Sequence, residues 1–96
     1  MSIRLLVTIT AAPGKGAELA QIYRARCANV MQEPGCEQYE VFHSTLNPDK
    51  LVLLEQWQDE AALDAHAKVH ATREPIPDGL RSGASQREYY QHNRTR

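Results

Sequence analysis

Residues 51–57, LVLLEQW, constrain the fold of this chain more than any other segment. Four apolar residues open the run, and they predict a buried strand. Side chains alternate between the two faces of a strand, so Glu55 and Trp57, two positions apart, lie on the same face. The strand therefore carries a carboxylate and an indole side by side within an apolar surface.

A helix is predicted directly after this strand. Asp59 is a good helix N-cap residue, and the pattern that follows extends the helix to about His70. His66 and His70 are four residues apart, so they lie on one stripe of that helix. Together the strand and the helix bring a carboxylate, an indole and an imidazole around one apolar wall, which indicates a pocket.

The rest of the chain predicts further elements separated by clear turns. Alternating apolar residues and helical periodicity predict strands at 3–10, 36–44 and 86–90 and a helix at 16–32. The segment 71–85 holds two prolines and two glycines and is expected to be an irregular loop. The polar tail 91–96 is expected to be flexible.

The resulting order, strand-helix-strand-strand-helix-strand, predicts one α+β domain over residues 1–96. This is the ferredoxin-like arrangement, an antiparallel sheet with both helices on one face. The other face carries Leu6, Val52 and Leu54, and large apolar side chains rarely stay in water as a contiguous patch. We therefore expect a homodimer in which two sheets pack face to face.

Composition excludes several functional classes. The net charge of −1 gives no basic surface for nucleic acid, and the expected strands lack the aromatic pairs with which RNA-recognition modules stack bases. No apolar run is long enough to span a membrane, and no secretory signal is recognisable, so a cytoplasmic protein is expected. Cys27 and Cys36 form no metal or redox motif, and we expect reduced, partly buried thiols.

Three short motifs resemble the antibiotic biosynthesis monooxygenase (ABM) family, which includes quinol monooxygenases. They are Glu33-Pro34-Gly35-Cys36 followed by Tyr39, then Leu54-Glu55-Gln56-Trp57, then Ala62-Leu63 followed by His66. The similarity covers about residues 3–70. It implies a dimeric α/β barrel built from two ferredoxin-like subunits, each with a pocket between its sheet and its helices.

The resemblance also implies chemistry. Some members of the family oxidise aromatic polyketides or quinols with O2, without metal or flavin. Others degrade haem with an Asn near the end of the first strand, but residues 7–10 contain no Asn, which disfavours haem degradation here. The sequence departs from the family pattern after His70, where Pro75 and Pro77 replace further helix.

His66 is the candidate catalytic residue, as a general base for a phenolic proton. The alternative is a helix histidine that is merely packed or solvated. Trp57 is a candidate wall for an aromatic substrate, or else a core residue. Glu55 is a candidate to orient His66, or else a structural partner of Arg4 or another arginine.

Other candidates line the same predicted pocket or its rim. Tyr39 and His43 share a strand face and are candidates to line this pocket, or else they face solvent or the dimer interface. His70 shares the helix stripe with the candidate base. Arg81, with Arg73, is a candidate receptor for an anionic substrate, or else a solvated loop charge. The two histidines on the helix have zinc-site spacing but lack the intervening Glu and a third ligand, so no metal site is expected.

The sequence thus supports two functional hypotheses. The first is a cofactor-independent monooxygenase acting with O2 on a small phenolic, quinol or polyketide-like aromatic molecule. The second is a non-catalytic dimeric α/β barrel protein that uses the same pocket to bind or sense a small molecule. Turnover of a substrate distinguishes them.

Overall fold

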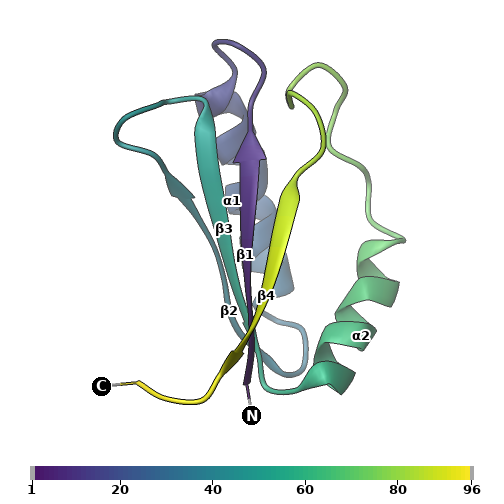
Figure 1. The fold of residues 1–96 in the computed structure, drawn as a ribbon. Helices are drawn as coiled ribbons and strands as arrows, with labels where there is room; N and C mark the ends of the chain where they lie inside the picture. Colours follow the sequence, from purple (N-terminus) through teal and green to yellow (C-terminus); the bar gives the residue numbers. More distant parts are fainter. Residues whose placement is uncertain (1, 96) are drawn as a thin grey trace.

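The computed structural model describes residues 2–95, and their elements follow the predicted order (Figure 1). The elements are β1 Ser2–Thr10, α1 Gly16–Val30, β2 Cys36–His43, β3 Lys50–Trp57, α2 Glu60–His70 and β4 Gln86–His92. This arrangement confirms the expected ferredoxin-like α+β fold.

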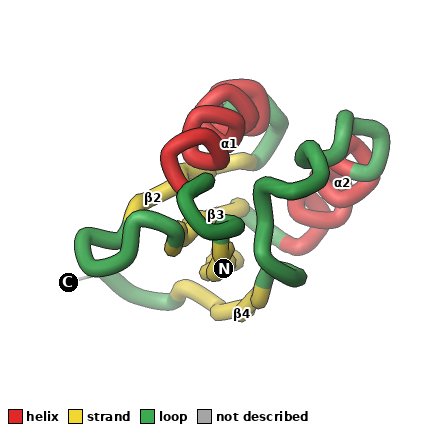
Figure 2. The backbone as a smooth tube through the Cα atoms, turned by 90° about the horizontal axis from the view of Figure 1, so that it is seen from above, coloured by secondary structure: helices red, strands yellow, loops and turns green. Residues whose placement is uncertain are grey.

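The four strands form one antiparallel sheet in the order β2-β3-β1-β4. Both helices lie on the same side of this sheet, with α1 over the β2–β3 half and α2 standing apart from it (Figure 2). The register aligns Leu5 of β1 with Glu55 of β3 and with Tyr89 of β4. These three side chains form one row across the sheet, from Glu55 on β3 to Tyr89 on the edge strand β4.

The hydrophobic core lies between the sheet and α1. Strand alternation buries one row of each central strand, as the sequence predicts: Ile3, Leu5, Val7 and Ile9 on β1, and Leu51, Leu53 and Trp57 on β3. Leu19 and Val30 of α1 close over this surface and are fully buried. The opposite face has no helix, and Leu6, Val52 and Leu54 are only half-buried there.

The fourth strand is longer than predicted. It runs to His92 instead of ending at residue 90, because Gln91 pairs with Ile3 and His92 pairs with Ser2 of β1. The expectation of a tail that starts at residue 91 was therefore wrong for its first two residues. The polar side chains of these two residues give no strand pattern in the sequence, because backbone pairing at a sheet edge does not require apolar side chains.

The loop after α2 is irregular, as expected, but its end is fixed to the sheet. The backbone N–H of Ala12 donates to the carbonyl of Leu80 at 2.9 Å, and the N–H of Ser82 donates to the carbonyl of Thr10 at 2.8 Å. Ile76 and Leu80 are buried and join the core. The loop therefore holds its arginines at defined places beside α1.

The two cysteines are half-buried free thiols. Burial is the main cause that raises the pKa of Cys27, and it raises the pKa of Cys36 to about 11. A thiol with a raised pKa is a poor nucleophile near neutral pH, so neither cysteine is a candidate nucleophile.

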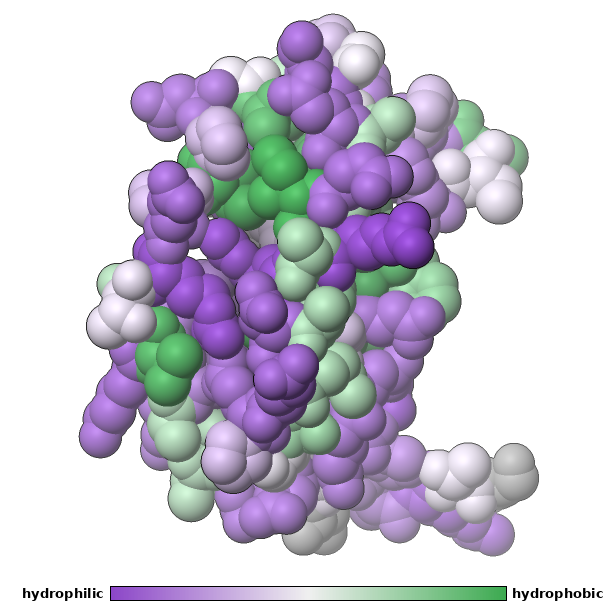
Figure 3. All heavy atoms as spheres, turned by 180° about the vertical axis from the view of Figure 1, so that it is seen from behind, coloured by the Kyte–Doolittle hydropathy of each residue, from purple (hydrophilic) through white to green (hydrophobic). Residues whose placement is uncertain are grey.

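Seen from the helix side, the surface is mostly hydrophilic and its apolar side chains gather in small separate groups (Figure 3). Within residues 2–95, neither helix is long and apolar enough to cross a membrane.

Gly16 packs against the hairpin between β2 and β3 at the first residue of α1. A Cβ atom at this position would overlap the backbone carbonyl oxygen of Pro48. We expect Gly16→Ala to lower the free energy of unfolding by about 1–3 kcal/mol, the usual cost of overpacking. Urea unfolding followed by circular dichroism measures this change. Gln21→Ala, at an exposed position of the same helix, should change it by less than about 0.5 kcal/mol. Equal stability of Gly16→Ala and the unmodified protein would contradict the close approach.

Candidate functional site

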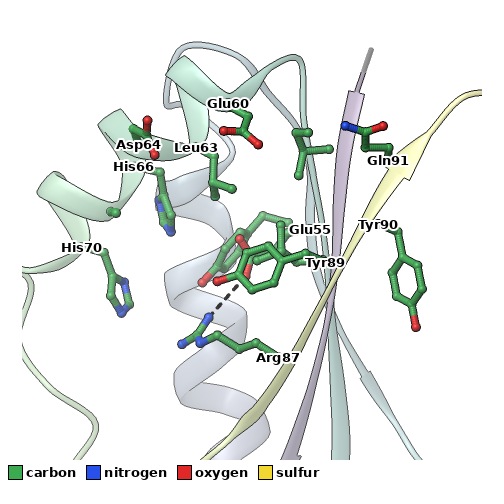
Figure 4. A pocket seen from close by; sticks show the side chains of 14 residues that line it. Glu55, Glu60, Leu63, Asp64, His66, His70, Arg87, Tyr89, Tyr90 and Gln91 are labelled. Atoms are coloured by element: carbon green, nitrogen blue, oxygen red, sulfur yellow. Dashed lines mark ion pairs between the residues drawn. The ribbon is translucent and has the colours of Figure 1, made fainter.

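A cavity of about 520 Å³ lies between α2 and the sheet (Figure 4). Helix α2 contributes Leu63, His66 and His70, and the sheet contributes Leu5, Tyr39, Glu55, Arg87 and Tyr89. In Figure 4 the two histidines extend from the helix towards the side chains of the sheet. A concave, partly apolar space with a few convergent polar groups is the usual form of a small-molecule site.

Glu55 is buried within the apolar face of β3, with 1% of its surface exposed. Its Oε1 accepts a hydrogen bond from Trp57 Nε1 at 3.0 Å, and its Oε2 lies 3.8 Å from Nη1 of Arg87. The sequence predicted a pairing of Glu55 with Arg4 or another arginine, and the partner is Arg87; Arg4 lies on the other face of the sheet and bonds to glutamines there. Alternation places residues 4 and 55 on opposite faces, which excludes this contact.

Burial raises the pKa of the Glu55 carboxyl above its ordinary value. The hydrogen bond from Trp57 and the nearby imidazole and guanidinium groups oppose this rise without cancelling it. A carboxylate without full solvation or a tight ion pair is costly, because the apolar wall cannot replace its water. Such groups are frequent at functional sites.

His66 is held by a carboxylate, but not by the one that the sequence suggested. Its Nδ1 lies 2.9 Å from Oε1 of Glu33, a residue of the turn between α1 and β2. The second oxygen of Glu33 accepts from Nη2 of Arg73 at 2.6 Å. Glu55 therefore does not orient His66, and Glu33 does. When Nδ1 donates to this carboxylate, Nε2 of the neutral ring is the proton acceptor.

Two aromatic rings pack against the imidazole of His66. The centroids of its ring and the Trp57 ring are 4.6 Å apart, and Tyr39 lies at 5.6 Å. Trp57 is a fully buried core residue and does not line the cavity; its ring packs against His66, and its Nε1 donates to Glu55. The structure therefore places Trp57 behind the imidazole, where it restricts the orientation of that ring.

The remaining predicted residues fall into two groups. His70 and Tyr39 line the cavity with His66, and the rings of His70 and His66 are 5.5 Å apart. His43 lies elsewhere, at the end of β2, where its Nε2 is 2.6 Å from the carbonyl oxygen of Pro48. Arg81 lies in the loop after α2 and does not line this cavity.

Sequence reasoning missed three residues of the site. Glu33 was noted as part of a motif, but nothing in the sequence pairs it with a histidine 33 positions away. Arg87 and Tyr89 lie on β4, which had no apolar pattern to mark it as a wall of a pocket. The register of β4 with β1 supplies the missing signal, because it places both side chains on the buried face of the sheet.

The acidic and imidazole groups of the cavity do not form a metal centre. Among residues 2–95, no three His, Cys, Asp or Glu side chains are grouped so that they could hold a metal ion.

Comparison with known proteins identifies relatives. The family model for antibiotic biosynthesis monooxygenase matches residues 2–74, the region that carries the motifs noted in the sequence. None of the curated proteins matches the chain. A solved structure from Pseudomonas aeruginosa is 28% identical, with a TM-score of 0.80 over 95% of this chain and 93% of that one.

Two further structures share the fold. A Shewanella oneidensis protein is 25% identical, with a TM-score of 0.77 over 93% of this chain and 88% of its own. A crystal structure of an antibiotic biosynthesis monooxygenase is 22% identical, with a TM-score of 0.76 over 94% and 97%. Nearly the whole architecture is therefore common to these proteins, although most residues differ.

The raised pKa of Glu55 predicts how stability depends on pH. The folded chain binds this proton more tightly than the unfolded chain, whose carboxyl keeps its ordinary pKa of 4.5. The contribution of Glu55 to the free energy of unfolding is therefore most favourable below pH 4.5 and is lost as pH rises through the folded pKa. Each unit of pKa difference corresponds to about 1.4 kcal/mol.

The test compares unfolding free energies of the unmodified protein and Glu55→Gln across pH 4–8 by urea denaturation. Their difference, unmodified minus variant, should fall as pH rises. Glu18→Gln, at an exposed site on α1, should show a difference that stays flat. A pH-independent difference for Glu55→Gln would show that burial does not perturb this carboxyl.

Proposed function

We propose that this chain, which belongs to the antibiotic biosynthesis monooxygenase family, oxidises a small phenol or quinol with O2 in the cavity beneath α2. The observation that carries the proposal is the arrangement of His66. A carboxylate binds its Nδ1, a buried indole supports its ring, and the residue lines a partly apolar cavity. Orientation by a carboxylate is how proteins prepare an imidazole to act as a base.

The first proposed step is proton transfer from the substrate hydroxyl to Nε2 of His66. The resulting phenolate is electron-rich and donates an electron to O2, which gives a phenoxyl radical and superoxide. Their combination forms a C–O bond to a ring peroxide, and cleavage of its O–O bond with loss of water leaves a quinone. A quinol and O2 thus give a hydroxyquinone and water, and the substrate supplies all the reducing equivalents without metal or flavin. The Glu33 carboxylate stabilises the imidazolium that forms, because it already accepts the Nδ1 hydrogen. His66 then acts through position and charge, and the reaction with O2 follows from the chemistry of the substrate.

The walls of the cavity support this sequence of events. Ile3 and Leu5 present apolar surface, and Tyr39 adds an aromatic ring against which a flat substrate would pack. Removal of water strengthens the attraction between the phenolate and the imidazolium and limits side reactions of a radical. The volume of about 520 Å³ lies within the usual range of small-molecule sites.

We propose that the protein assembles as a homodimer. The face of the sheet opposite the helices carries the half-buried side chains of Leu6, Val52 and Leu54, and Phe42 is 43% exposed beside them. A second copy of the same face would cover this surface and give the dimeric barrel that the family resemblance implies.

Oxygen uptake with hydroquinones tests the role of His66. His66→Ala should lower kcat by about a hundred- to ten-thousandfold, the usual contribution of a general base. Glu33→Gln keeps a hydrogen-bond acceptor but removes the charge, so it should lower kcat less and shift the pH profile. His43→Ala, outside the cavity, should keep normal uptake.

Unchanged uptake in His66→Ala, with normal circular dichroism, would exclude His66 as the base. Hydroquinones that bind at the cavity without any uptake of O2 would instead favour a small-molecule-binding protein.

Sedimentation velocity tests the proposed dimer. Leu54→Lys places a charge on the uncovered sheet face and should convert the dimer to a monomer at micromolar concentration. Val69→Lys, at a 44% exposed position on α2, should leave the dimer intact. A monomer in the unmodified protein would exclude the sheet-to-sheet assembly.

A further inference from the structure

A second, smaller cavity of about 250 Å³ adjoins the first. The two share Tyr39, His70 and Arg87, so they meet along one border. The smaller cavity is strongly basic, because four arginines from three different parts of the chain line it: Arg26 of α1, Arg73 and Arg81 of the loop after α2, and Arg87 of β4. One carboxylate residue, Glu74, lines it as well.

Two residues of this cavity hold buried nitrogen atoms without a hydrogen-bond partner within residues 2–95. They are Nδ1 of His70 and Nη1 of Arg73. A buried polar group without a partner is unfavourable, and such groups are rare in folded proteins. Both residues line the smaller cavity, and an oxyanion bound there would offer a hydrogen-bond acceptor to the guanidinium group of Arg73.

The surrounding carboxylates neutralise the four arginines only in part. The bond from Arg26 goes to the backbone carbonyl of Glu74, at 2.5 Å, and not to its carboxylate. Arg87 lies 3.8 Å from Glu55, which is a long ion pair. Arg73 forms an ion pair with Glu33, but the same carboxylate also bonds to His66, so its negative charge is shared between two partners.

The charge of the larger cavity has the opposite sign. Three carboxyl groups, of Glu55, Glu60 and Asp64, line it with one arginine, Arg87, whereas three further arginines line only the smaller cavity. The pKa of His70, at the border, is lowered by burial and by the nearby positive groups, His66 and Arg26 among them. The combined space is therefore polarised from an acidic end to a basic end.

We infer that the smaller cavity binds an oxyanion, a carboxylate or a phosphate, carried by the aromatic molecule whose ring occupies the larger cavity. The inference rests on the proposed function for the identity of the ring, but the anion site stands on the arginines alone. Guanidinium groups bind oxyanions through paired, charge-assisted hydrogen bonds. The substrate class is then a phenolic acid or a phosphorylated phenol, with its hydroxyl group at His66.

Calorimetric titration under anaerobic conditions tests this site without turnover. The probes are hydroquinone, 2,5-dihydroxybenzoate, benzoate and inorganic phosphate. The added carboxylate should make 2,5-dihydroxybenzoate bind at least tenfold tighter than hydroquinone. Binding of benzoate alone indicates a carboxylate site, and binding of phosphate alone indicates a phosphoryl site; either result supports an oxyanion site.

Variants locate the binding. Arg26→Gln should weaken the binding of 2,5-dihydroxybenzoate by about ten- to a hundredfold and leave the binding of hydroquinone unchanged. Arg24→Gln, an exposed neighbour on the same helix, is the matched control and should bind normally. If Arg26→Gln loses the circular dichroism spectrum of the folded protein, Arg81→Gln replaces it, because this side chain is exposed and its loss should weaken only the binding of the anionic probe.

Equal affinity of the neutral and anionic hydroquinones, or equal loss in Arg24→Gln, would overturn the anion site. The result is independent of the proposed reaction. Tight, arginine-dependent binding without oxygen uptake on any probe would contradict the proposed oxidation and support the anion site. Oxygen uptake without selectivity for the anionic probe would support the oxidation and contradict the anion site.

Discussion

The site depends on one carboxylate that holds two partners. Glu33 lies in the turn between α1 and β2, and its two oxygens bind His66 of α2 and Arg73 of the following loop. Three segments that are distant in sequence therefore meet at a single side chain. Helix α2 stands apart from α1 (Figure 2), and the imidazole of His66 on this helix packs against the indole of Trp57 on β3. The orientation of the imidazole thus follows from this bridge and from the indole below it, and both are largely removed from water.

A second constraint is the two-residue period of β3. It buries Leu51, Leu53 and Trp57 as a core row and forces Glu55 into the same row. An apolar residue there would be less costly, since burial raises the pKa of this carboxyl and one indole N–H is its near hydrogen-bond donor. The Glu55 carboxyl accepts the indole N–H of Trp57 and so helps to fix the ring that packs against His66. It also adds a polar group to the lining of the cavity.

The fold could be predicted from the sequence because local patterns determine it. Alternation gave β1 and β3, Asp59 caps α2 through the N–H of Ala62, and the Pro34-Gly35 turn separates α1 from β2. The site could be predicted only in part. His66 and Tyr39 follow from the faces of their own elements, but the pairing of Glu33 with His66 spans 33 residues and has no local signal. The roles of Arg87 and Tyr89 depend on the register of an edge strand whose side chains are polar on both faces.

The arrangement of charge explains why the fixed loop matters. Residues 71–85 could have remained mobile, as expected of a segment rich in proline and glycine, and mobile arginines would contribute little to a defined site. Two hydrogen bonds fix the loop instead, one that the carbonyl of Leu80 accepts from Ala12 and one that Ser82 donates to Thr10, and Ile76 is buried in the core. Arg73 is then held by Glu33 and lines the smaller cavity together with Arg26 and Arg87. Like charges repel, so a group of arginines around one cavity is more stable when an anion binds among them.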